Sequence, residues 1–167
     1  TLYFGLRREI APPLALAYVA VQIVAAILGV YAAHAMFGNT IFEVSQKLRE
    51  GPAQAFSEFV ATFGLIATIA GAVRFQPAIT PFLVGLYITA AYWFTASTSF
   101  ANPAVTIARS LSDSFAGIAP RSAPAFVIAQ IVAAIAGYFV SSWLFAMKVN
   151  SSEHVSEPVS APAIDTR

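Results

Sequence analysis

Cysteine is absent from the sequence, and charged residues are few. Without cysteine the chain can form no disulfide and no thiolate metal site. The two histidines, His34 and His154, lie far apart in the sequence and predict no metal-binding cluster. Lysine and arginine number 9 against 8 for aspartate and glutamate, which argues against a nucleic-acid partner and a polybasic membrane patch. We therefore expect no metal, no cofactor and no nucleic acid.

The sequence is rich in apolar residues. Only 10% of its residues are charged, against about 25% in soluble domains. Hydrophobic residues make up 58% of the chain, and the mean hydropathy is +0.73. A spanning helix needs about 20 largely apolar residues, and runs of that length recur. We predict an all-α membrane protein with four spanning helices, at residues 11–37, 53–73, 78–96 and 122–147.

The remaining segments connect or flank these spans. Residues 38–52 are predicted to be a loop. Residues 148–167 turn to Ser, Glu, Pro and Val without periodicity and are predicted to be a disordered tail. The third apolar run is too long for one span, and small polar residues interrupt it near its end. We predict a re-entrant loop and half-helix over residues 97–112.

The half-helix has a clear start signal. Asn102 is a good N-cap, and Pro103 falls at the first helical position, where its missing N–H costs nothing. At membrane depth, non-helical backbone ahead of such a helix is tolerated only where protein buries it or water lines it. The positive end of the helix suits a water-lined pore that repels cations. The alternative is a capped turn in an ordinary loop.

An internal repeat is the most informative pattern. Residues 22–29 reappear as residues 130–137 with seven of the eight positions identical. Further back, Thr1 aligns with Thr106, which follows Asn-Pro-Ala-Val. We therefore expect residues 1–10 to be the end of a first half-helix and a loop, in an N-terminally truncated fragment. The alternative is that apolar helices resemble each other by composition. Two such repeats in inverted orientation are common in membrane transport proteins.

With these motifs the chain resembles the major intrinsic protein family, the aquaporins and aquaglyceroporins, as a bacterial-type member. The resemblance rests on Asn102-Pro103-Ala104, on the repeat, and on Glu58 within Ala-Phe-Ser-Glu-Phe-Val-Ala-Thr-Phe. It implies a right-handed helical bundle with inverted repeats, assembled as a homotetramer with one pore per subunit. It also implies passive conduction of water or small neutral solutes.

The resemblance assigns roles to individual residues. Asn102 would offer its amide to permeating molecules while it caps the helix, together with Pro103 and Ala104 of the same motif. Glu58 would be a buried structural acid that accepts from the re-entrant loop, because an intramembrane carboxylate is costly unless paired. The alternative for Glu58 is a charge near a helix end that reaches water. Backbone carbonyls of the loop would line the pore, at Ser97, Thr98 and Phe100.

The constriction departs from the family pattern. The position after Asn-Pro-Ala, usually Arg, is Val105 here. The other constriction positions correspond to Tyr92 and Ser99. Arg109, one turn further along, is a possible secondary residue that we expect to pair locally with Asp113. A valine predicts a wider and less polar mouth, which glycerol-like solutes and metalloid hydroxides require and water does not.

The predicted function is a passive channel for water, small neutral solutes, or both, in the bacterial inner membrane with a cytoplasmic tail. The alternative is a non-conducting scaffold or adhesion member of the same fold. An enzyme is disfavoured, because the sequence shows no paired carboxylates, no histidine cluster and no nucleophile–base pair. The expected partners are water, small neutral solutes, the lipid bilayer and further copies of the same chain.

Overall fold

A computed structural model describes residues 1–146 of the chain, and the predicted tail at 148–167 lies outside them. The described residues form helices and connecting segments without a strand, so the predicted all-helical class is confirmed. Four helices are long and apolar enough to cross a membrane, which makes this an integral membrane protein with several spans. The elements are α1 (Leu2–Leu6), α2 (Pro12–Phe37), α3 (Pro52–Phe75), η1 (Pro77–Ile79), α4 (Thr80–Phe94), α5 (Pro103–Arg109) and α6 (Ala123–Ala146).

Proline and glycine mark the ends of the helices. Pro12 and Pro52 begin α2 and α3, at positions where the missing N–H is not needed. Gly38 ends α2 in the left-handed conformation, with φ +69°, and its N–H donates to the carbonyl of His34. Only glycine adopts that conformation without steric cost, so the chain can leave α2 in a tight turn.

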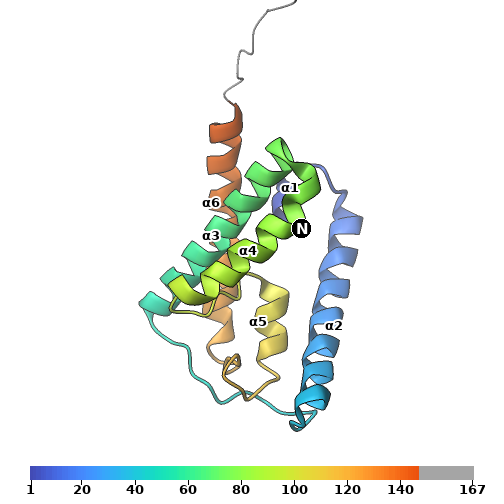
Figure 1. Ribbon diagram of the computed structural model, residues 1–167, viewed down its shortest axis with the longest axis vertical. Helices are drawn as coiled ribbons and strands as arrows, with labels where there is room; N and C mark the ends of the chain where they lie inside the picture. Colours follow the sequence, from blue (N-terminus) through green and yellow to red (C-terminus); the bar gives the residue numbers. More distant parts are fainter. Residues whose placement is uncertain (147–167) are drawn as a thin grey trace, which may run out of the picture.

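The long helices pack in pairs, and the short helices lie against them (Figure 1). α3 packs along α6 as the main helix pair, and α4 packs on α3. α5 lies between α2 and α6, while α1 packs on α6 and α2. At the α3–α6 contact Gly137 faces Ile66, where an added Cβ would lie only 2.7 Å from the isoleucine side chain, so the glycine lets the two helices approach closely.

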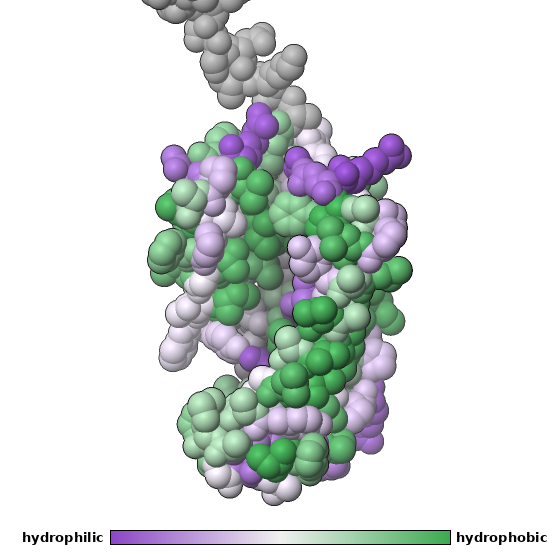
Figure 2. Space-filling view, turned by 90° about the vertical axis from the view of Figure 1, so that its right-hand side faces the viewer, coloured by the Kyte–Doolittle hydropathy of each residue, from purple (hydrophilic) through white to green (hydrophobic). Residues whose placement is uncertain are grey.

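The outer faces of the long helices are hydrophobic. Leu16 on α2, Phe82 on α4 and Trp93 on α4 are each more than 70% exposed, at 72%, 73% and 88%. Figure 2 shows hydrophobic residues over much of one face, with hydrophilic residues at its upper end and a hollow in its middle. Side chains of this kind belong in lipid or against another protein surface, because in water they would form aggregation-prone patches.

The repeat has a counterpart in three dimensions. Gln22 of α2 donates from Nε2 to the hydroxyl of Thr1, at 2.9 Å. Gln130 of α6 donates from Nε2 to the hydroxyl of Thr106, at 2.8 Å. These are the residue pairs that the repeat alignment matches. Two separate pieces of the chain thus use the same glutamine–threonine contact to hold a short helix against a long one.

Candidate functional site

The start of α5 has the predicted geometry. Asn102 is extended, with φ −156°, and its side-chain oxygen accepts from the N–H of Ala104 at 2.9 Å. Pro103 is the first helical residue. The carbonyl of Asn102 accepts from the N–H of Thr106, at 3.0 Å, which closes the first turn. The amide nitrogen of Asn102 has no partner within residues 1–146, so it is free to donate to another molecule.

The loop ahead of α5 has an unusual backbone. Thr98, Ser99 and Ala101 adopt positive φ angles of 64°, 49° and 52°. Non-glycine residues pay about 1–3 kcal/mol each in such a conformation, and they keep it only where the surroundings impose it. Ser99, Phe100 and Ala101 are all buried. The loop is therefore held in a defined shape by the rest of the fold.

Glu58 of α3 is one of the groups that hold the loop. It is fully buried, and its two carboxylate oxygens accept from the backbone N–H groups of Phe100, at 3.3 Å, and of Ala101. It also accepts from Nε2 of Gln130, at 3.0 Å. A buried carboxylate needs several donors to replace its lost hydration. Here the loop backbone supplies two of them, and α6 supplies the third.

Gln130 was not among the predicted site residues, although it lies inside the repeat. Its Nε2 donates both to Glu58 and to Thr106, and it is almost completely buried. One side chain of α6 thereby connects α3 with α5. The signal that could have identified it is the glutamine shared in register by the two repeats, because a polar residue inside an apolar run needs a buried partner.

Arg49 was also missed by the sequence analysis. It comes from the connection between α2 and α3, yet it is only 6% exposed. Its guanidinium donates to the carbonyls of Gly117, at 2.8 Å, of Ser97, at 3.2 Å, and of Phe115, at 3.0 Å. Burial and the nearby charge of Arg109 lower the pKa of Arg49. Arginine nevertheless stays charged in proteins, so Arg49 is a permanent cation that joins the re-entrant loop to the α5–α6 connection.

The contact with Arg49 changes the expectation for one pore-lining carbonyl. The carbonyl of Ser97 accepts from Arg49 and from the hydroxyl of Thr98, and Ser97 is fully buried. That carbonyl is thus engaged within the protein. Thr98 is half-buried and Phe100 is buried with its N–H on Glu58. Thr98 is therefore the most accessible of the three residues.

Two of the predicted constriction residues, Val105 and Ser99, are packed inside the protein, and the third, Tyr92, is exposed. Val105 packs against Phe100 and its buried neighbours Ile118 and Phe126. Ser99 is buried, and its hydroxyl has no partner among the described residues. Tyr92, by contrast, is 40% exposed near the end of α4.

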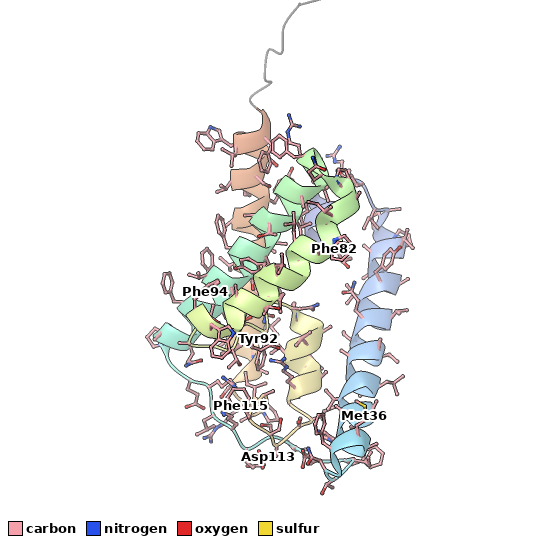
Figure 3. All side chains as sticks on the ribbon, in the orientation of Figure 1. Met36, Phe82, Tyr92, Phe94, Asp113 and Phe115 are labelled. Atoms are coloured by element: carbon pink, nitrogen blue, oxygen red, sulfur yellow. The ribbon has the colours of Figure 1, made fainter. Side chains whose placement is uncertain are left out.

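Arg109 does not pair with Asp113 as we expected. Its Nη2 donates to the hydroxyl of Tyr92, and its guanidinium lies 4.5 Å from the ring centre of Phe100. Asp113 instead accepts from the backbone N–H of Gln46, at 2.8 Å. α5 ends at Arg109, so Asp113 is not one helical turn further along and its side chain points elsewhere. Figure 3 shows Tyr92 near the end of α4, and Asp113 in the connection that follows α5.

Two cavities border α5. The first, about 320 Å³, is called the α2/α5 cavity here. Its lining includes Gly29, His34, Val105, Arg109 and Ser112. The second, about 440 Å³ and called the central cavity, is lined from α1, α2, α3 and α6 and by the residues of the Asn-Pro-Ala motif. The free amide of Asn102 thus belongs to a residue that borders a space large enough for small molecules.

These features define a class: a multi-span helical membrane protein with two short helices, each tied to a long helix by the same contact, that border one central cavity. Among proteins of known function, the chain is 50% identical over 144 residues to Aquaglyceroporin AqpS of Rhizobium meliloti (strain 1021). The match covers 86% of this chain and 62% of the relative, so the chain spans about three fifths of that protein's length. No family model and no solved structure matches. The chain belongs to the major intrinsic protein family.

Proposed function

We propose that the chain forms part of a passive transmembrane channel for water and small neutral solutes, including glycerol-like molecules and metalloid hydroxides. The observation that carries the proposal is the start of α5. A helix begins inside the bundle, its cap residue Asn102 keeps a free amide beside the central cavity, and the strained loop before it is held by Glu58 and Arg49.

This arrangement suits neutral solutes. An amide and backbone carbonyls can replace the hydrogen bonds of water or of a hydroxyl group as it passes. The N-terminus of α5 carries a partial positive charge that opposes cations and protons. No transported group needs to react, so the proposal includes no enzymatic activity.

Val105 sets the expected solute range. An arginine here would fill the constriction with a guanidinium, whereas valine packs back onto the Phe100 cluster and leaves the space open. A wider and less polar constriction favours molecules larger than water. The name of the relative, an aquaglyceroporin, supports a channel of this kind.

The proposed setting is the inner membrane of a bacterium, with the C-terminal tail in the cytoplasm and four copies of the chain in one assembly. The exposed apolar faces of α2, α4 and α6 support contacts with lipid or with other copies.

The test is a flux assay on the protein from its complete reading frame in liposomes. Stopped-flow light scattering follows shrinkage in sucrose and then in glycerol. We expect fast shrinkage in sucrose, and in glycerol shrinkage followed by fast re-swelling. Fast shrinkage without re-swelling in glycerol would mean a water-selective pore and would contradict the role of Val105. No flux above empty liposomes would favour the non-conducting scaffold.

A further inference from the structure

Two arginines lie against one aromatic ring beside the re-entrant loop. The guanidinium carbon of Arg49 is 5.2 Å from the ring centre of Phe100, and that of Arg109 is 4.5 Å from it. In residues 1–146 neither arginine forms an ion pair with a carboxylate. The ring contributes a cation–π attraction to each of them. This part of the protein therefore brings together two positive charges that form no direct ion pair, with the buried carboxylate of Glu58 nearby under the same loop.

The two arginines differ in how many of their donors are used. Arg49 gives hydrogen bonds from Nε, Nη1 and Nη2 to three backbone carbonyls, so it serves the structure of the loops. Arg109 gives one hydrogen bond, from Nη2 to Tyr92. Its Nη1 is buried and has no partner among the described residues. A buried donor of a charged group is costly to leave unpaired, so this nitrogen requires an acceptor.

The side chain that carries this donor lines the α2/α5 cavity, together with Val105 and His34. The other polar groups of that cavity already have partners. His34 contacts the carbonyl of Ile41 through Nδ1, at 3.1 Å, and the hydroxyl of Ser112 through Nε2, at 2.9 Å. A carbonyl can only accept, so Nδ1 donates to Ile41, while Nε2 lies against the hydroxyl of Ser112 and 3.4 Å from the carboxylate of Glu43. Nη1 of Arg109 therefore needs an oxygen atom at this cavity that accepts its hydrogen bond.

Arg109 follows Val105 by four residues, which is about 6 Å along the axis of α5. The cation that the family places directly after Asn-Pro-Ala is thus absent, while a different cation stands one turn further on the same helix. Tyr92 and Phe100 hold it in a fixed orientation from α4 and from the re-entrant loop.

We propose that Arg109 is a specificity-determining residue that contacts the solute, binding a hydroxyl oxygen of a small neutral solute in the α2/α5 cavity before the solute reaches Val105. The proposal rests on the proposed channel function. It assigns solute recognition to Arg109, with Tyr92 as its positioning residue, and leaves Val105 to set the width.

The test measures glycerol flux against glycerol concentration, with water flux in parallel, in liposomes that contain the protein from its complete reading frame. Arg109→Met removes the cation and keeps much of the length of the side chain. We expect it to raise the half-saturating glycerol concentration about tenfold, as for the loss of one hydrogen bond to a charged group, and to lower the ratio of glycerol to water flux. Arg121→Met is the matched control. Arg121 is an exposed arginine paired with Glu50, and its loss should change neither quantity.

Two further variants keep the test decisive if Arg109→Met folds poorly. Arg109→Lys retains the charge and loses the planar fork of donors, so it should give an intermediate half-saturating concentration. Tyr92→Phe removes only the hydroxyl that orients the guanidinium, and it should shift the same quantity in the same direction. Wild-type half-saturation in folded Arg109→Lys and Tyr92→Phe would overturn the proposal.

The remaining outcomes separate this proposal from the channel function. If the unmodified protein conducts glycerol and folded Arg109→Met matches it in half-saturation and flux ratio, the role of Arg109 is wrong and the channel stands. If the unmodified protein conducts nothing, both proposals fail. Formate flux tests whether Arg109 binds an ionised oxygen instead of the oxygen of a hydroxyl group. A loss of formate flux in Arg109→Met, with glycerol flux unchanged, would overturn the assignment to neutral solutes.

Discussion

Replacement of Glu58 by glutamine tests whether the re-entrant loop depends on this carboxylate. In the structure one carboxylate oxygen accepts from Ala101 and Gln130, and the other accepts from Phe100. Glutamine has one accepting oxygen and an NH2 group. Whichever way the amide is turned, its NH2 faces at least one of these donors, so at least one hydrogen bond is lost and the others are no longer charge-assisted.

The size of the effect follows from these contacts. A hydrogen bond to a charged group contributes about 1.5–3 kcal/mol, roughly twice a neutral one. Losing one such bond and weakening two gives a destabilisation on the order of 3 kcal/mol. For a protein of this size that corresponds to a fall in Tm of roughly 6–12 °C. The strained residues of the loop should then relax, because the backbone N–H groups of Phe100 and Ala101 lose the carboxylate that accepts from them.

The assay is thermal unfolding of the purified protein in detergent, followed by size-exclusion chromatography. Glu50→Gln is the matched control, because Glu50 is an exposed acid that pairs with Arg121 and should be neutral on substitution. A Glu58→Gln protein that melts with the unmodified one, yet changes its ratio of glycerol to water flux, would refute our reasoning. It would place Glu58 in the solute path instead of under the loop.

Two more outcomes are expected. Val105→Arg should reduce glycerol flux in liposomes more than water flux, because a guanidinium narrows the constriction; an unchanged flux ratio would contradict the role of Val105. Arg49→Met should lower the free energy of unfolding by about 3 kcal/mol, because it removes three charge-assisted hydrogen bonds and leaves the buried carbonyl of Gly117 without a donor, whereas Arg121→Met should leave it unchanged. Equal melting temperatures for these two arginine variants would show that Arg49 does not hold the loops together.

The start of α5 could be predicted because its causes are local. The capping oxygen of Asn102 and the ring of Pro103 act within one turn of the chain, so three adjacent residues contain the whole explanation. The partners of Glu58 were foreseeable only in part. An acid inside an apolar run must be paired, and the family resemblance pointed to the loop backbone, but the contribution of Gln130 comes from 72 residues away.

Arg49 and Arg109 show where sequence reasoning failed. Arg49 sits in a stretch of mixed charge that looks solvated, and its partners follow 48 to 68 residues later in the chain. Arg109 was matched with Asp113 on the assumption that α5 continues, whereas the helix ends and the chain turns. Both errors concern long side chains, whose flexible stems allow partners that spacing along the chain does not reveal.

The sequence by itself determined the class of protein, the number of long apolar helices, the repeat and the place where the short helix begins. Each of these follows from composition or from interactions between near neighbours. Only the tertiary structure decided which groups meet around α5: the carboxylate under the loop, the two arginines on Phe100 and the tyrosine that orients one of them. Those contacts join α3, α4, α6 and two connections, and their geometry depends on how the helices pack.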